Sequence, residues 1–428
     1  MNFHAGLRLI GPGMVFAATS IGVSHVVQAT RAGADFGYTL AALIIIAHLV
    51  KLPFFRVGAV YAAITGESLL DAYHRQGKLA YGIAVLVNFV TMFIIMAAVS
   101  IVAAGVLANI LPFNLSVNLW SAIVMFSVIG LLVGGGYALL NKLIRWMMLV
   151  FAILCLVTFV ALFVVDLPSP ASVQVDYSTA TSIAFMVALV GWMPTAIEVS
   201  VWHSLWVVEK NRLESADVHH PSKSAAPLKD SKLRQVSKVI LDFNIGYIFC
   251  VVFALMFMVF GAKLFFGQGQ ALQDSAIGFS AQLITIFTTV LGDWSRPLVS
   301  VLIFIAMYST CLAVADGFSQ VITRIAEKQF SLPQQKHLLC YKSIIPMICL
   351  GGWLVIYLFA GQLKLLIDFA TTIAFVTAPV FAWLNLRAMS LPNVPIEMRI
   401  KGAYRLYSWC CLLLLIGFAG FFVYWFLF

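Results

Sequence analysis

The sequence predicts an all-α integral membrane protein of about 11 transmembrane helices, on the basis of its hydropathy, its few charges and its basic loops. Hydrophobic residues make up 62% of the 428 residues and charged residues only 10%. A soluble domain has roughly 45–50% apolar and about 25% charged residues. We therefore expect a protein embedded in lipid, with no enzymatic activity, no cofactor and no nucleic-acid partner, despite its net charge of +9.

The predicted spans follow the apolar runs in order along the chain, because a helix needs roughly 20 apolar residues to cross the hydrocarbon core. Together they form one domain over residues 1–428, and the polar segment 209–238 is expected to be a flexible cytoplasmic loop. The spans are predicted at 11–30, 36–57, 80–111, 117–137, 143–166, 180–208, 239–266, 297–323, 343–361, 364–389 and 404–427.

The distribution of basic residues fixes the predicted orientation. Of the 26 Lys and Arg residues, only Arg31, Lys263, Arg296 and Lys364 fall in segments that an odd number of spans places outside. Lys51 is counted with the basic residues of the segments predicted to face the cytoplasm. Because cytoplasmic loops are enriched in Lys and Arg, the N-terminus is predicted to be cytoplasmic and the C-terminus outside. We expect a bacterial inner membrane.

Two of the predicted spans are interrupted. Gly22, Ser24 and His25 lie in the middle of the first, where a lipid-facing helix would carry large apolar residues. Gly191 and Pro194 interrupt the sixth, and a carboxylate follows within about one turn. Breaks of this kind release backbone carbonyls and place helix ends at the membrane midplane. Two ordinary kinks with satisfied backbone are the alternative interpretation.

The position of the breaks predicts an internal repeat. Spans one and six are the first members of two five-helix halves, and broken helices at matching positions are typical of inverted-repeat transporters. The sequence thus predicts a 5+5 arrangement, with repeat 1 at about 8–166, repeat 2 at about 178–389 and an extra helix at about 404–427.

The first span also resembles a known family. Gly11-Pro12-Gly13 opens it, Arg31-Ala32-Gly33-Ala34 closes it, and Gly37-Tyr38 follows. These segments are similar to those of the Nramp family of divalent-metal transporters, which has the LeuT-type fold with helices one and six broken. The resemblance implies that fold and the transport of a small ion.

The chain departs from this family where the family binds metal. The family's Asp-Pro-Gly-Asn falls on Gly22-Val23-Ser24-His25, so Gly22 replaces the Asp and His25 replaces the Asn. Its Met-Pro-His falls either on Ala196-Ile197-Glu198 or on Met193-Pro194-Thr195. The span at 80–111 has no carboxylate, so the family's acidic proton route is missing. Substrate and coupling ion therefore stay open.

Polar residues within spans are the candidates for function, because burying charge in a membrane is costly. Glu198 shares a helix face with Thr195 and is predicted to serve substrate or proton; a structural hydrogen bond is the alternative. For Asp316, a place on the ion path and a role in helix packing are both open. His203 is a further candidate for the proton pathway, with packing as the alternative. Asp242 is expected at the membrane interface.

Three functions are compatible with these residues. The first is a secondary active transporter of a divalent metal, with a substrate site at Gly22, Ser24, His25, Thr195 and Glu198 and with His25 and Glu198 as metal ligands. For His25, a structural hydrogen bond to a backbone carbonyl is the alternative. The second is a transporter of a small organic solute in the same fold. The third is a membrane sensor that transports nothing. The expected partners are a small ion or small molecule and the lipid bilayer.

Overall fold

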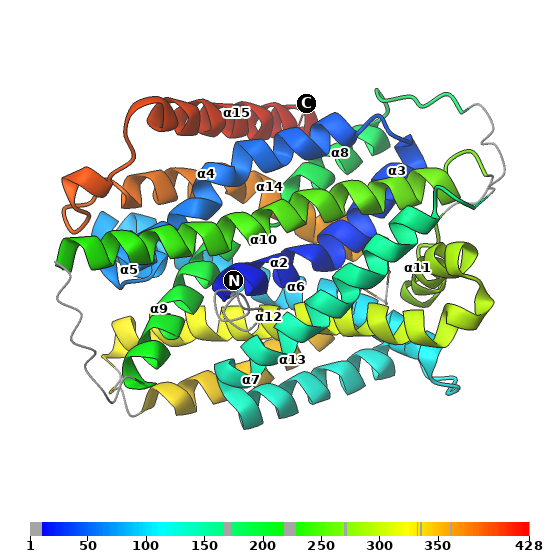
Figure 1. The fold of residues 1–428 in the computed structure, drawn as a ribbon, viewed down its shortest axis with the longest axis horizontal. Helices are drawn as coiled ribbons and strands as arrows, with labels where there is room; N and C mark the ends of the chain where they lie inside the picture. The colour runs from blue at the N-terminus through cyan, green and yellow to red at the C-terminus, as the bar shows by residue number, and fades with distance from the viewer. Residues whose placement is uncertain are drawn as a thin grey trace.

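Long apolar helices run side by side in a computed structural model of the chain (Figure 1). The structure describes residues 11–165, 173–217, 228–268, 272–331, 333, 336–359 and 362–427. Within these ranges it is helical and contains no strand, and eight helices are long and apolar enough to cross a membrane. Three shorter apolar helices accompany them. The all-α prediction is confirmed.

The first half of the chain begins with an interrupted helix and continues through long spans. Its elements are α2 (Pro12–Ser20), the π-helix η1 (Ile21–Ala29), α3 (Thr30–Phe36), α4 (Ala41–Thr65), α5 (Leu69–Gln76), α6 (Lys78–Ile110) and α7 (Val117–Ala161). At 45 residues, α7 is about twice as long as one crossing requires. Its apolar segments Val117–Gly135 and Trp146–Ala161 correspond to the two spans predicted there.

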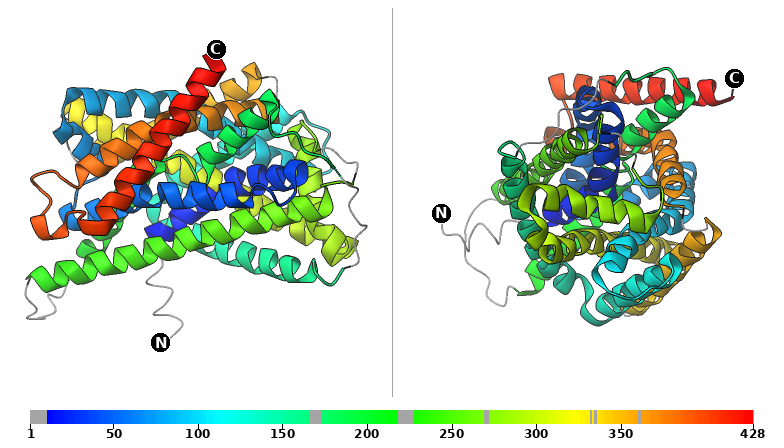
Figure 2. Two further views of the ribbon diagram at one scale, coloured as in Figure 1. Left: turned by 90° about the horizontal axis from the view of Figure 1, so that it is seen from above. Right: turned by 90° about the vertical axis from the view of Figure 1, so that its right-hand side faces the viewer.

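The second half repeats the pattern of a broken helix followed by long spans. Its elements are α8 (Ala180–Trp192), α9 (Val199–Asp217), α10 (Leu228–Leu264), α11 (Ala276–Leu291), η2 (Asp293–Ser295), α12 (Arg296–Phe330), α13 (His337–Leu358), α14 (Leu363–Ala388), η4 (Ile396–Met398) and α15 (Gly402–Leu427). In Figure 2, α15 crosses obliquely over the outside of the bundle.

Three features differ from the prediction. The segment 209–238 is not all loop, because α9 continues to Asp217 and α10 begins at Leu228; residues 218–227 lie outside the described part of the chain. The apolar helix α11 was expected to be part of an outer loop, since its 16 residues are too few for a span. The short helix α5 was also not predicted; Ser68 and Asp71 start it with reciprocal capping bonds.

The interrupted first helix packs against α10 through glycines. A Cβ on Gly33 would lie 1.9 Å from the carbonyl oxygen of Met258, and one on Gly261 would lie 2.1 Å from that of Thr30. The backbones of α3 and α10 can approach this closely only because both positions lack a side chain, as is common between membrane helices. This contact holds the first helix beside the core of the bundle.

Asp242 of α10 explains the Gly-Pro-Gly opening. Its carboxylate accepts hydrogen bonds from the backbone N–H of Gly11 at 2.9 Å and of Gly13 at 2.8 Å. Pro12 has no N–H to satisfy and suits the first turn of a helix. A carboxylate is also favoured at the positive end of the helix dipole. Asp242 therefore anchors the start of α2, a more specific role than the interfacial position expected from the sequence.

Replacing Asp242 with Ala should lower the free energy of unfolding by about 2–3 kcal/mol, because two amide groups lose a charged acceptor. Thermal unfolding of the purified protein in detergent measures this. The matched control is Asp293→Ala, since Asp293 is exposed in η2. Equal melting temperatures for the two variants would contradict the capping role.

Candidate functional site

The break in the first helix lies at Gly22. Its φ of −64° and ψ of −122° are not helical, and the surrounding η1 is wound as a π-helix. Thr310 of α12 fills the space beside it: a Cβ on Gly22 would lie 2.2 Å from the Thr310 hydroxyl oxygen. That hydroxyl donates to the carbonyl of Ala18 at 3.0 Å. The break predicted in this span is confirmed, and α12 packs directly against it.

The sixth helix is broken between the end of α8 at Trp192 and the start of α9 at Val199. The connecting segment passes beside the first break, where the Ser24 hydroxyl donates to the carbonyl of Pro194 at 3.0 Å. The two interrupted helices therefore meet at their non-helical segments. This is the geometry in which transporters of this type place a substrate near the membrane midplane.

Lys51 of α4 satisfies the backbone at the end of α8. Its ammonium group donates to the carbonyls of Val190 at 2.6 Å, Gly191 at 2.7 Å and Thr195 at 3.2 Å. The side chain is fully buried. Its positive charge lies at the negative end of the α8 dipole, which compensates part of the cost of burial.

The structure corrects the assignment of Lys51 to the basic residues of a loop. It lies in the middle of α4 and inside the bundle. The available signal was its position within the predicted span 36–57, where a Lys is rare and indicates a function or a buried partner.

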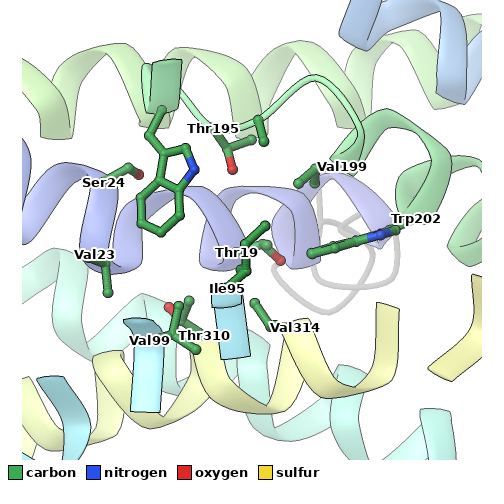
Figure 3. Close-up of a pocket in the computed structure, with 12 residues that line it drawn as sticks. Thr19, Val23, Ser24, Ile95, Val99, Thr195, Val199, Trp202, Thr310 and Val314 are labelled. Atoms are coloured by element: carbon green, nitrogen blue, oxygen red, sulfur yellow. The ribbon is translucent and has the colours of Figure 1, made fainter. Parts of the chain in front are cut away.

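A small cavity of about 20 Å³ lies where the two breaks cross (Figure 3). Four hydroxyl groups line it, one each from the first and sixth helices' breaks, one from α2 and one from α12, and two tryptophans form part of its wall. No charged side chain is among the residues that line it. The polar residues and tryptophans of the lining are Thr19, Ser24, Thr195, Thr310, Trp192 and Trp202.

Glu198 is close in sequence to Thr195 and Val199, which line this cavity, but it does not line the cavity itself. It is 2% exposed and precedes the first residue of α9, so its charge lies at the positive end of that helix. One carboxylate oxygen accepts from the Thr91 hydroxyl at 3.2 Å. The other has no hydrogen-bond partner among the described residues. A buried carboxylate oxygen without a partner is suited to a proton or a cation.

His25 does not line the cavity, but it contacts a residue that does, because its Nδ1 lies 2.8 Å from the Ser24 hydroxyl oxygen. Its Nδ1 lies 2.7 Å from the carbonyl oxygen of Ser20, and its Nε2 lies 2.9 Å from that of Cys250 on α10. Both ring nitrogens thus have partners in this conformation. The structure therefore brings Ser24 and Thr195 together at the break formed by Gly22, and leaves His25 and Glu198 outside the lining. Within the described residues, no three His, Cys, Asp or Glu side chains form a metal cluster.

An aromatic pair packs at the edge of the cavity. Trp202 lines the cavity and packs edge-on against Phe318 of α12, with ring centroids 4.5 Å apart. Its ring lies against Gly317, where an added Cβ would be 2.6 Å away. Further along the same helices, Leu205 and Asp316 line a different and much larger cavity. Trp202 and Phe318 thus pack together between α9 and α12, and the two cavities share no lining residue.

The larger cavity, of about 690 Å³, contains Asp316. This carboxylate accepts hydrogen bonds from Trp206 at 2.7 Å, Gln320 at 2.8 Å and Tyr341 at 2.5 Å. The sequence suggested Asp316 for the ion pathway or for helix packing, and the geometry is compatible with both, because the group lines a cavity and also joins three helices. Its role remains a prediction.

Ion pairs surround the mouth of this cavity. Asp71 of α5 pairs with Arg324 at 2.9 Å and Lys328 at 2.8 Å. Burial alone would raise the pKa of Asp71, but the positive charges of Arg324 and Lys328 outweigh burial and hold its pKa below the usual value. The carboxylate therefore stays ionised and ties α5 to the end of α12.

The opposite side of the bundle is closed more tightly. Arg31 of α3 pairs with Asp368 of α14 through two hydrogen bonds, of 2.7 and 3.2 Å, and its guanidinium lies 4.8 Å from the centre of the Phe185 ring. The cavity beside this pair measures only about 70 Å³. The cavity on the Asp316 side is thus larger than the one on the Arg31 side.

His203, also suggested for the proton pathway, lies in none of these cavity linings. Its ring stacks on Phe243, with ring centroids 5.7 Å apart, and neither ring nitrogen has a hydrogen-bond partner among the described residues.

Thr310 lines the central cavity but was not predicted from the sequence. The available signal was its hydroxyl within an apolar span, which indicates a contact between helices.

Comparisons with known proteins agree with this architecture. The natural resistance-associated macrophage protein-like family, Nramp, matches residues 13–425. An uncharacterized protein of Pasteurella multocida is 33% identical over 410 residues, covering 94% of this chain and 88% of that protein. The manganese transporter of Eremococcus coleocola has a similar structure, with a TM-score of 0.70 at 16% identity, covering 98% of this chain and 87% of the other. The structure of MhsT in complex with L-phenylalanine has a TM-score of 0.61 at 13% identity, covering 95% and 98%.

Replacing Lys51 with Met should lower the free energy of unfolding by about 2–3 kcal/mol, because buried carbonyls at the end of α8 lose their donor. Loss of the buried charge recovers part of this cost, so the effect is smaller than the sum of three hydrogen bonds. Melting in detergent measures it, with Lys78→Met as the control because Lys78 is exposed at the start of α6. A Lys51→Met variant as stable as the control would refute this role.

Proposed function

This chain belongs to the Nramp family, and from that premise we propose that it is a secondary active transporter of a divalent metal cation. Family membership and fold make it a membrane transporter. The cargo and the coupling are our proposal, because the pair of Asp and Met expected at the family's metal site is not intact here.

The size of the central cavity is the observation that supports an ion best. The cavity of about 20 Å³ is slightly larger than the roughly 10–15 Å³ that a cavity needs to hold one water molecule. An ion with part of its water shell fits a space of this order, whereas an amino acid would require the helices to move apart.

The donor chemistry favours a hard cation. The polar side chains that line the cavity offer hydroxyl oxygens and no thioether or imidazole. Oxygen ligands and retained water suit Mn²⁺ or Mg²⁺ better than softer metals. Ser24 and Thr195 would face the hydrated ion, and Glu198 would supply the negative charge one turn along the sixth helix. Glu198, with Asp316 and His203 as further candidates on the inner side, would also carry the coupling proton.

A small organic solute is the second candidate, and one observation favours it. The indole nitrogens of Trp192 and Trp202 line the cavity region and have no hydrogen-bond partner among the described residues. N–H donors beside aromatic walls suit a carboxylate or carbonyl group of a small molecule. This candidate requires a wider cavity than the one observed.

We also propose that the protein resides in a bacterial inner membrane with its N-terminus inside and its C-terminus outside. The protein is integral to a membrane, and the excess of Lys and Arg on one side supports the orientation. Figure 1 places α5, the start of α10 and the connection into α15 at one end of the bundle, as this map requires. A reporter fused after Phe428 should be active only outside; activity in the cytoplasm would reverse the map.

Uptake by proteoliposomes tests the function and the role of Glu198 together. The wild-type protein should take up Mn²⁺ or Mg²⁺ saturably, and Glu198→Gln should reduce uptake at least about tenfold without loss of melting temperature, because removing a buried charge also removes its burial cost. The control is Glu397→Gln, at an exposed position in η4.

The pattern of loss separates the possible roles. If Glu198 binds the cation, Gln should weaken binding at every pH; if it carries a proton, binding should persist while the pH dependence of uptake disappears. Normal uptake with reduced stability would make Glu198 structural. Uptake of labelled amino acids in the absence of metal uptake would replace the metal proposal with the organic solute.

A further inference from the structure

A fourth cavity lies where α14 ends and α15 begins. It measures about 420 Å³ and shares no lining residue with the central cavity or with the cavity around Asp316. It is formed by the last turns of α14, the segment that follows them, and the first turns of α15. α15 is the helix outside the two repeats, so this cavity belongs to the extra helix and not to the transport machinery.

The cavity is strongly basic. Arg387, Arg399, Lys401 and Arg405 line it, and no Asp or Glu does. Arg399 is fixed in place because its guanidinium donates to the carbonyls of Val394 and Leu391, each at 3.1 Å. In the described part of the chain, none of the other three cations forms an ion pair with a carboxylate.

Four cations around one cavity repel one another unless an anion lies between them. Some basic side chains near the membrane ends have acidic partners, such as Arg324 with Asp71 and Arg75 with Glu67, whereas Lys78 and Lys336 are exposed and form no ion pair in the described part of the chain. The cations at the start of α15 differ because four of them line one cavity without a carboxylate, which suits an anion from outside the chain. Ser390 adds a hydroxyl to the lining.

The surroundings place this cavity at the depth of lipid headgroups. Arg387 is in the last turn of one span and Arg405 is in the first turn of the next. Trp383 and Trp409 border the cavity and are 41% and 42% exposed, and tryptophan is enriched at the membrane–water interface. The Arg387 guanidinium lies over the Trp383 ring at 5.2 Å. Further along α15, apolar side chains such as Leu413, 63% exposed, are available to acyl chains.

We propose that this cavity binds the headgroup of an anionic phospholipid carrying two phosphate groups, with its acyl chains along α15. Basic pockets between transmembrane helices are typical sites for such headgroups. Four cations match two phosphates better than one, and arginine binds phosphate through paired N–H donors. Because α15 lies on the outside of the bundle (Figure 2), a lipid bound here would join it to α14.

The test is lipid binding by the full-length protein, measured by native mass spectrometry and by melting in a zwitterionic detergent. Cardiolipin should bind and raise the melting temperature, phosphatidylethanolamine should not, and phosphatidylglycerol should have an intermediate effect. The double variant Arg387→Gln/Arg405→Gln should bind cardiolipin about 30-fold more weakly, as expected for the loss of two interfacial cations. The double variant Lys78→Gln/Lys336→Gln loses the same charge at exposed positions outside the cavity and should bind normally.

Several results would overturn the proposal. Equal weakening in the two double variants would mean that cardiolipin responds to net charge alone. Saturation of the site by inorganic pyrophosphate with no added effect of lipid would identify a soluble phosphate compound as the ligand. If the Arg double variant does not fold, Lys401→Gln in the exposed connection should still weaken cardiolipin binding about fivefold, and unchanged binding would refute the site. None of these outcomes depends on which substrate is transported.

Discussion

A helix that is broken inside a membrane needs a partner for each backbone group it exposes, and this requirement organises the structure around the sixth helix. No bulk water is available there, so an unpaired carbonyl is costly. Lys51 provides the answer at the end of α8, where its ammonium reaches three carbonyls. Ser24 provides another by donating to Pro194 across the two breaks. Side chains from α4 and from the first helix therefore satisfy the backbone at the break. These hydrogen bonds link both elements to the broken sixth helix.

The two ends of the broken sixth helix face ionisable side chains of opposite sign. Lys51 lies at the negative end of α8, and Glu198 lies at the positive end of α9. Each charge opposes the dipole of the helix end that it faces, so the two half-helices are stabilised separately. Between them the cavity lining is uncharged. A small charged cargo in the cavity would therefore feel both ends, and its binding would depend on the protonation and position of Glu198.

The sequence was sufficient for the architecture and for the positions of the two helix breaks, because both follow from local composition. Runs of apolar residues locate spans, and Gly22 and Pro194 locate breaks irrespective of distant contacts. The sequence could not show that Lys51 points inward, since position within a span does not fix which helix it faces. The contact of His25 with the carbonyl of Cys250 could not be predicted from the sequence either, because Cys250 on α10 is more than 200 residues away along the chain. Long-range partners decide such roles, whereas hydropathy decides the fold.

The loss of the family's metal-binding acid from the first helix has a structural counterpart at the same place. Gly22 is packed by Thr310, whose hydroxyl would lie 2.2 Å from any added Cβ, so an Asp cannot be restored here unless α12 moves. In the function proposed above, the negative charge of the site comes from Glu198, which accepts a hydrogen bond from Thr91 of α6. Side chains of α6 and α12 both line the cavity at the break, so the composition of the site and the packing of these helices are linked. A cation that enters would then be bound by the half of the sixth helix that follows the break, and the first helix would contribute only neutral oxygens.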